Sequence, residues 1–268
     1  MSGSWTVDPG TLQALRLGEA QKAIAVGELD KALIEAEELL DEDPSHPKAL
    51  EMVSQAALGM GDVVMALEAL NRFVELHTPD SRILHALAVA RFQAVDYPGA
   101  LAAAEQATAL DKQLTAAWHY QGLALQRMGK CEVAEERFSV ASKQDPKNFP
   151  KHPGWAEIDW DAILSAALDK LPQPIQVFYD GIKIRFDDFP AVEDLLENYP
   201  PLSPFTDALY RGQPPKDGDP WVQQPEIVSL FRGNLSRPST ATEDITKRTA
   251  EALMHEAMHW LGVSEMPS

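Results

Sequence analysis

The chain has 268 residues, of which 45% are hydrophobic and 24% charged, so it is long enough for one or two domains with real cores. Its 23 Lys and Arg stand against 41 Asp and Glu, which gives a formal net charge of −18. Nucleic acids and anionic membranes are bound by clustered basic side chains, and this chain shows no such cluster. We therefore expect neither a nucleic acid nor a membrane as a partner.

The sequence lacks the segments that direct a protein into or across a membrane. No apolar run approaches the about 20 residues that span a bilayer. The start, MSGSWTVDPG, lacks the basic and apolar stretches of a signal peptide. The one cysteine, Cys131, cannot form an internal disulfide and suits a reducing compartment. These features predict a soluble, cytoplasmic protein.

An internal repeat with a period of 34 residues occupies the first half of the chain. Alanine recurs at this spacing at Ala32, Ala66, Ala100 and Ala134. Small residues stand twelve positions earlier, at Ala20, Ser54, Ala88 and Gly122. The positions five residues before the alanines are Gly27, Gly61, Val95 and Gly129. Small residues let two helices approach closely and glycine permits a tight turn, so the pattern predicts four stacked helix–turn–helix units.

Residues 13–148 resemble an array of about four tetratricopeptide repeats. The last unit carries the resemblance best, through Trp118, Tyr120, Gly122, Ala134, Phe138, Ala141 and Pro146. The resemblance implies an all-α solenoid whose groove binds a protein or peptide. The alternative is that the array only supports the part of the chain that follows.

The second half of the chain has a different, mixed pattern. A segment rich in Pro, PKNFPKHPGW at 146–155, marks the boundary, and we place the second domain at 156–268. In chain order we predict a helix over 160–171, a strand or hairpin over 175–186, a short helix over 191–197, a short helical turn over 206–212, a strand over 225–235 and a helix over 242–261. The predicted class is therefore α+β, with a small sheet and a long helix near the end.

The last predicted helix carries the motif HEAMHWLGVSE at 255–265. His255 and His259 are four residues apart, so both imidazoles project from one helix face and can bind one metal ion. Glu256 lies where its carboxylate can reach a water molecule beside that metal. At Gly262 the helix should end in a left-handed turn, after which the chain can fold back and offer Glu265 as a third ligand. Three protein ligands and one open position are typical of catalytic zinc.

Residues 158–265 resemble the minimal bacterial zincin-like, matrix-metalloprotease-like metallopeptidase domain. Besides the motif, the segments IKIRFDDFP, LYRG and IVSLFRGNL carry this resemblance. It implies a compact zincin core with His255, His259 and Glu265 as zinc ligands and Glu256 as the catalytic base.

Two functions remain open on the sequence. One is a zinc-dependent metallopeptidase whose repeats recruit a protein substrate or partner. The other is a tetratricopeptide adaptor whose metal site is structural or catalytically inactive. A scaffold without metal would require the histidine motif to be accidental.

Overall fold

The computed structural model of the chain describes residues 9–151, 154–197, 200–215, 217, 219–237 and 241–263. The chain divides into two compact units, and the main division falls between Pro150 and Lys151. Within these ranges, no helix combines the length and the apolar character that crossing a membrane requires.

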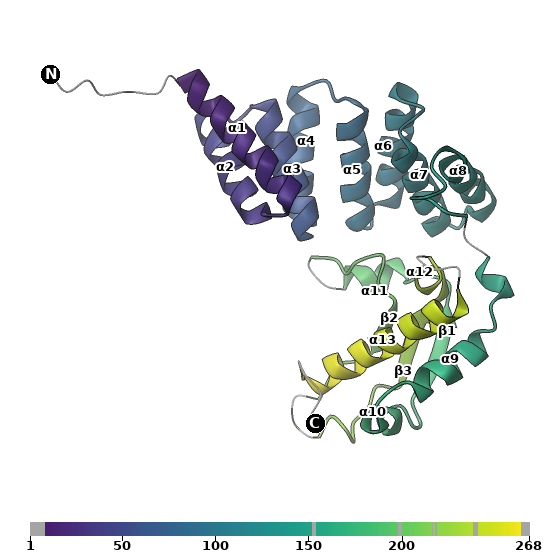
Figure 1. Cartoon of the computed structure of the whole chain (residues 1–268). Coiled ribbons are helices and arrows are strands. Elements are labelled where there is room, and N and C mark those ends of the chain that lie inside the picture. Colours follow the sequence, from purple (N-terminus) through teal and green to yellow (C-terminus); the bar gives the residue numbers. More distant parts are fainter. Residues whose placement is uncertain are drawn as a thin grey trace. The chain divides into compact units, whose positions relative to one another are not determined.

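The first unit consists of helices joined by short turns (Figure 1). In chain order they are α1 (Pro9–Val26), α2 (Leu29–Glu42), α3 (Pro47–Met60), α4 (Val63–Leu76), α5 (Ser81–Gln93), α6 (Tyr97–Leu110), α7 (Thr115–Arg127) and α8 (Cys131–Gln144). Each odd-numbered helix packs against the helix that follows it, and neighbouring pairs stack on one another. The predicted all-α solenoid of helix pairs is confirmed.

The 34-residue repeat marks the places where helices touch. Four of its alanines are fully buried: Ala32, Ala66, Ala100 and Ala134. Among the small residues twelve positions earlier, Ala20, Ser54 and Ala88 are also 0% exposed. A larger side chain at any of these positions would push two helix backbones apart, because protein interiors are close-packed. The repeated small residues of the sequence therefore mark the repeated helix–helix contacts of the structure.

The turn inside each helix pair has the same left-handed backbone. The φ angles are 80° at Gly27, 79° at Gly61 and 74° at Gly129. Val95 occupies the corresponding place in the third pair and has a φ of 65°, although it is not glycine. Its side chain is 7% exposed, so burial holds a β-branched residue in a conformation that such residues rarely adopt.

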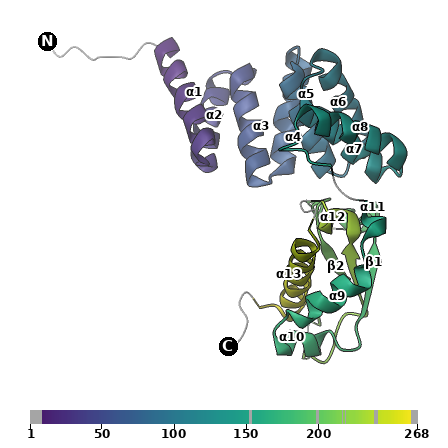
Figure 2. The ribbon, with the colours of Figure 1, turned by 45° about the vertical axis from the view of Figure 1, so that its right-hand side comes forward.

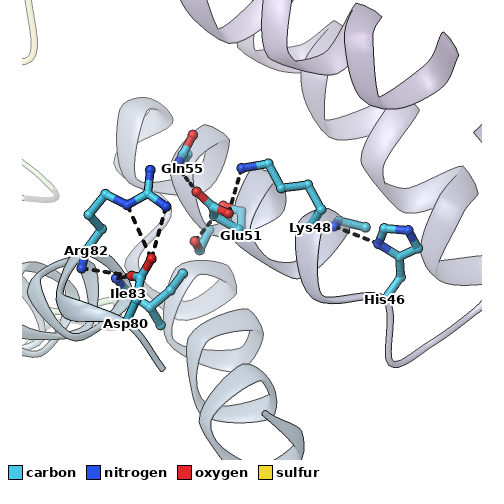
Figure 3. A network of polar contacts seen from close by, with 9 residues as sticks. His46, Lys48, Glu51, Gln55, Asp80, Arg82 and Ile83 are labelled. Carbon is cyan, nitrogen blue, oxygen red and sulfur yellow. Dashed lines mark hydrogen bonds and ion pairs between the residues drawn. The ribbon is translucent and has the colours of Figure 1, made fainter. Parts of the chain in front are cut away.

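Short polar side chains begin several of these helices by accepting hydrogen bonds from the first turn. Asp62, Asp80 and Asp96 do so for α4, α5 and α6, at N···O distances of 2.9 Å to Met65, Arg82 and Gly99 respectively. At α3, Nδ1 of His46 accepts from the N–H of Ala49 at 3.3 Å. Figure 3 shows two of these caps beside the contacts of Lys48, Glu51, Gln55 and Arg82. Such caps satisfy N–H groups that the helix itself leaves unpaired.

Two glycines of the repeat unit should respond in opposite ways to replacement by alanine. A Cβ added to Gly122 in α7 would lie 2.5 Å from Cε1 of Phe138, whereas one added to Gly18 in α1 would meet nothing within 4 Å. We expect Gly122→Ala to destabilise the array by about 1–2 kcal/mol, because overpacking outweighs the gain in helix propensity. Gly18→Ala should instead stabilise it by about 0.5–1 kcal/mol. Denaturation followed by circular dichroism measures both, and equal shifts would contradict the close packing at Gly122.

The second unit begins with a 3-10 turn and ends with its longest helix (Figures 1 and 2). In chain order its elements are the 3-10 turn Trp155–Glu157, α9 (Trp160–Asp169), α10 (Gln173–Phe178), β1 (Lys183–Asp187), α11 (Val192–Leu196), β2 (Ala208–Arg211), β3 (Ile227–Phe231), α12 (Arg232–Leu235) and α13 (Thr242–Leu261). The strands form a sheet in the order β1-β3-β2. β3 is parallel to β1 and antiparallel to β2, so β2 lies at an edge. The predicted small α+β unit is confirmed.

Strand register decides which side chains face the helices. Val228 pairs with Ile184 on one side and with Tyr210 on the other, and all three belong to one apolar core. The same core contains Ala167 of α9 and Leu253 of α13, both 0% exposed. The face of β2 that carries Tyr210 is therefore the face against which α13 packs.

Three predicted elements differ from the structure. Residues 175–186 do not form a hairpin, because Gln173–Phe178 is a helix with Pro174 in its first turn and only Lys183–Asp187 is a strand. The predicted helical turn over 206–212 is wrong, since Ala208–Arg211 is the edge strand β2. The predicted strand over 225–235 ends at Phe231 and continues as the short helix α12. The helix predicted over 242–261 is confirmed at both ends.

Candidate metal and catalytic site

Helix α13 presents one apolar face to the core and one polar face to solvent. The residues it buries follow helical spacing: Ile245, Thr246, Thr249, Ala250, Leu253, Glu256, Ala257, Trp260 and Leu261. Gly262 ends the helix with a φ of 67°, in the left-handed conformation predicted from the sequence. Glutamate is the one ionisable residue in this buried set. Helix α13 thus buries one carboxylate, that of Glu256, among its apolar residues.

His255 and His259 lie next to each other on the exposed side of α13. Their ring centroids are 5.8 Å apart and their planes differ by 30°. The side chain of His255 is 74% exposed. The spacing of four residues therefore brings the two imidazoles together on one face, as expected for residues one helical turn apart.

Glu256 lies between the histidines and the core and is 8% exposed. Its Oε2 accepts a hydrogen bond of 3.0 Å from the backbone N–H of Tyr210, and its Oε1 lies 3.3 Å from Nδ1 of His255. Burial raises the pKa of this carboxyl, although the N–H of Tyr210 and the two histidines act in the opposite direction. A carboxylate with a raised pKa is a better proton acceptor than an exposed one.

Tyr210, on the edge strand β2, is a neighbour of the candidate site that the sequence did not predict. Besides its N–H contact with Glu256, its hydroxyl lies 3.2 Å from Nδ1 of His259. Burial and the charge of Glu256 raise the pKa of this phenol. The segment was predicted to be a helical turn, and a side chain on a turn has no fixed relation to a helix some 45 residues later. Only the alternation of Ala208-Leu209-Tyr210-Arg211 could have indicated a strand.

The two histidines have the donor atoms that zinc requires. Nδ1 of His255 faces Glu256 and Nδ1 of His259 faces Tyr210, and within the described part of the chain neither Nε2 makes a hydrogen bond. Both Nε2 atoms are therefore available as ligands, which fits the imidazole chemistry of zinc sites. The described residues contain no group of three or more His, Cys, Asp or Glu side chains that could hold a metal. The predicted third ligand, Glu265, lies outside the described residues.

Two families match parts of the chain. The zincin-like metallopeptidase family matches residues 179–267, which include the histidine motif and β2. The tetratricopeptide repeat family matches residues 54–120, from α3 into α7. No curated protein matches the chain.

Several solved structures are similar to the chain over about half of its length. The crystal structure of MamA is 25% identical, with a TM-score of 0.45, and the match covers 47% of this chain and 74% of that one. YrrB, described as a TPR protein with an unusual peptide-binding site, is 19% identical with a TM-score of 0.45, over 57% of this chain and 73% of that one. The pilF protein of Pseudomonas aeruginosa is 16% identical with a TM-score of 0.46, over 51% of this chain and 62% of that one. The family models thus find a tetratricopeptide repeat region at residues 54–120 and a zincin-like metallopeptidase domain at residues 179–267, which agrees with the helix pairs and the small α+β unit.

Proposed function

We propose that the protein is a zinc-dependent metallopeptidase whose repeats recruit a protein or peptide. One observation carries the proposal: on α13, the buried carboxylate of Glu256 lies 3.3 Å from His255, whose exposed ring neighbours that of His259. His255 and His259 would hold the zinc ion through Nε2, and Glu265 would complete the ligand set. The match of residues 179–267 to the zincin-like metallopeptidases supports the same assignment.

In the proposed mechanism, hydrolysis of a peptide bond depends on the metal ion, on Glu256 and on the backbone N–H of Tyr210. A bound zinc ion would polarise the carbonyl of the peptide bond and make the attacking water more acidic. Glu256 accepts the proton that this water loses and passes it to the nitrogen of the departing amine, so the carboxylate is regenerated. Its burial favours this role because the raised pKa allows it both to take and to release a proton. The N–H of Tyr210 holds Oε2 and so fixes the direction from which the carboxylate acts.

The repeat region would supply the substrate. Stacked helix pairs form an extended concave surface, and arrays of this kind bind peptides along it. We propose that residues 13–148 form the recruiting domain and residues 156–268 the catalytic one. The match of residues 54–120 to the tetratricopeptide repeats supports the first assignment.

Zinc content and peptide cleavage test this function together. The purified wild-type chain should contain about one zinc per molecule and cleave members of a peptide library, and a chelator should abolish the cleavage. His259→Ala should lose both the zinc and the cleavage, because two remaining ligands do not hold zinc firmly. His77→Ala, in the repeat unit, removes a histidine whose Nε2 contacts the carbonyl of Ser45 and serves as the matched control.

The outcomes separate the two functions left open by the sequence. Equal zinc contents in the wild type and in both variants would show that His259 does not hold the metal. Stoichiometric zinc in the wild type without cleavage of any peptide would favour the adaptor with a structural or inactive metal.

A further inference from the structure

We infer that Tyr210 is a positioning residue for the metal site, because its hydroxyl fixes the ring of His259 while its backbone N–H fixes Glu256. The inference rests on the proposed zinc site and deepens it. It assigns a role to an edge-strand residue that lies outside the histidine motif.

The contact with His259 is a side-chain contact with defined geometry. The hydroxyl of Tyr210 lies 3.2 Å from Nδ1, and the two ring centroids are 6.1 Å apart. On another side the Tyr210 ring packs edge-on against Trp260, with centroids 5.0 Å apart. The ring therefore has little freedom to swing away from the histidine.

A histidine that binds a metal through one nitrogen needs a partner for the other. That partner fixes the tautomer and the ring orientation, and it makes the ligating nitrogen more basic. In the tautomer that carries the proton on Nδ1, His259 donates to the hydroxyl oxygen of Tyr210, which leaves the lone pair of Nε2 for the metal. Nδ1 of His255 has a neighbour as well, since it lies 3.3 Å from Oε1 of Glu256.

The strand that carries Tyr210 is tied to α13 at more than one place. Arg248 of α13 donates to both carboxylate oxygens of Asp207, the residue before β2, at 2.6 and 2.9 Å. The carbonyl of Asp207 in turn accepts from the N–H of Phe231. These ties hold Tyr210 beside α13, so its two contacts can orient the side chains of the proposed base and of one proposed ligand.

Tyr210→Phe tests the inference because it removes only the hydroxyl and leaves the N–H on Glu256. Zinc affinity, measured on the full chain by competition with a chromophoric chelator, should fall about 10–100-fold. The visible spectrum of the cobalt-loaded protein should change as well, because it reports ligand geometry.

Tyr179→Phe is the matched control. The hydroxyl of Tyr179 also bonds α13, donating to the carbonyl of Leu253 at 2.6 Å, but it does not touch a proposed ligand. This variant should melt at a lower temperature than the wild type and bind zinc equally tightly. Tyr210→Phe without metal should melt close to the wild type.

The possible outcomes distinguish an error in the role of Tyr210 from an error in the proposed zinc site. Equal zinc affinities for Tyr210→Phe and the wild type would overturn the role of Tyr210, and so would equal losses in the two tyrosine variants. In both cases a wild type that binds zinc and cleaves peptides leaves the proposed function standing. A wild type that binds no zinc would overturn both.

Discussion

Glu256→Gln is expected to keep zinc and to hydrolyse peptides about 10²–10⁴-fold more slowly than the wild type. Glutamine has the same shape as glutamate, so its side-chain oxygen can still accept from the N–H of Tyr210. It cannot take a proton from water at neutral pH, which is the step that the mechanism assigns to Glu256. Steady-state hydrolysis of a cleaved peptide, with zinc content measured on the same sample, checks both parts.

Glu251→Gln is the matched control for this experiment. Glu251 is on the same helix, but its side chain is 64% exposed and its ion pair with Lys247 spans 3.6 Å. Hydrolysis should be unchanged in this variant, because exposed ion pairs contribute little. Full hydrolysis by Glu256→Gln would remove Glu256 from the mechanism. Loss of zinc from it would mean that Glu256 holds the site together.

The second large effect is on stability: Phe178→Ala should destabilise the second unit by about 3–5 kcal/mol. Phe178, in α10, is 1% exposed and packs edge-on against Tyr179 and Trp221. Its removal leaves a cavity in the core that also carries α13. Urea denaturation followed by tryptophan fluorescence measures this, since most tryptophans belong to the second unit: Trp155, Trp160, Trp221 and Trp260.

The neighbouring Val177 provides the control and tests the corrected secondary structure. Val177 is 62% exposed, so Val177→Ala should change the free energy of unfolding by less than about 0.5 kcal/mol. In a strand, Ile175 and Val177 would face the same side. In the helix, Ile175 and Phe178 do so instead, and they are 0% and 1% exposed. A large cost for Val177→Ala would therefore favour the strand.

The elements that the sequence predicted best are those set by contacts close in the chain. The end of α13 at Gly262 depends on a backbone conformation that glycine adopts readily. The repeat alanines, such as Ala66 and Ala100, lie at fixed spacing because a small buried residue is needed at the same place in every helix pair. Local rules of this kind can be read along the sequence.

The edge strand and its part in the site could not be predicted in this way. β2 has four residues, and its partner for Tyr210 is Val228, 18 residues later. Such a short strand exists only because a distant segment pairs with it. The histidine motif lies on one helix and was visible, whereas the contacts of Tyr210 with Glu256 and His259 depend on how the sheet meets that helix. Glu265 stays a prediction.

Val95 has a consequence for how such arrays change over time. A β-branched residue with a φ of 65° costs about 1–3 kcal/mol. The third turn nevertheless has the shape that glycine gives to the other three. The packing of the neighbouring helices thus imposes the left-handed turn, and Val95 adopts this conformation despite its energetic cost. A single repeat can therefore lose its turn glycine by mutation while the turn, and with it the stacking of the helix pairs, is kept.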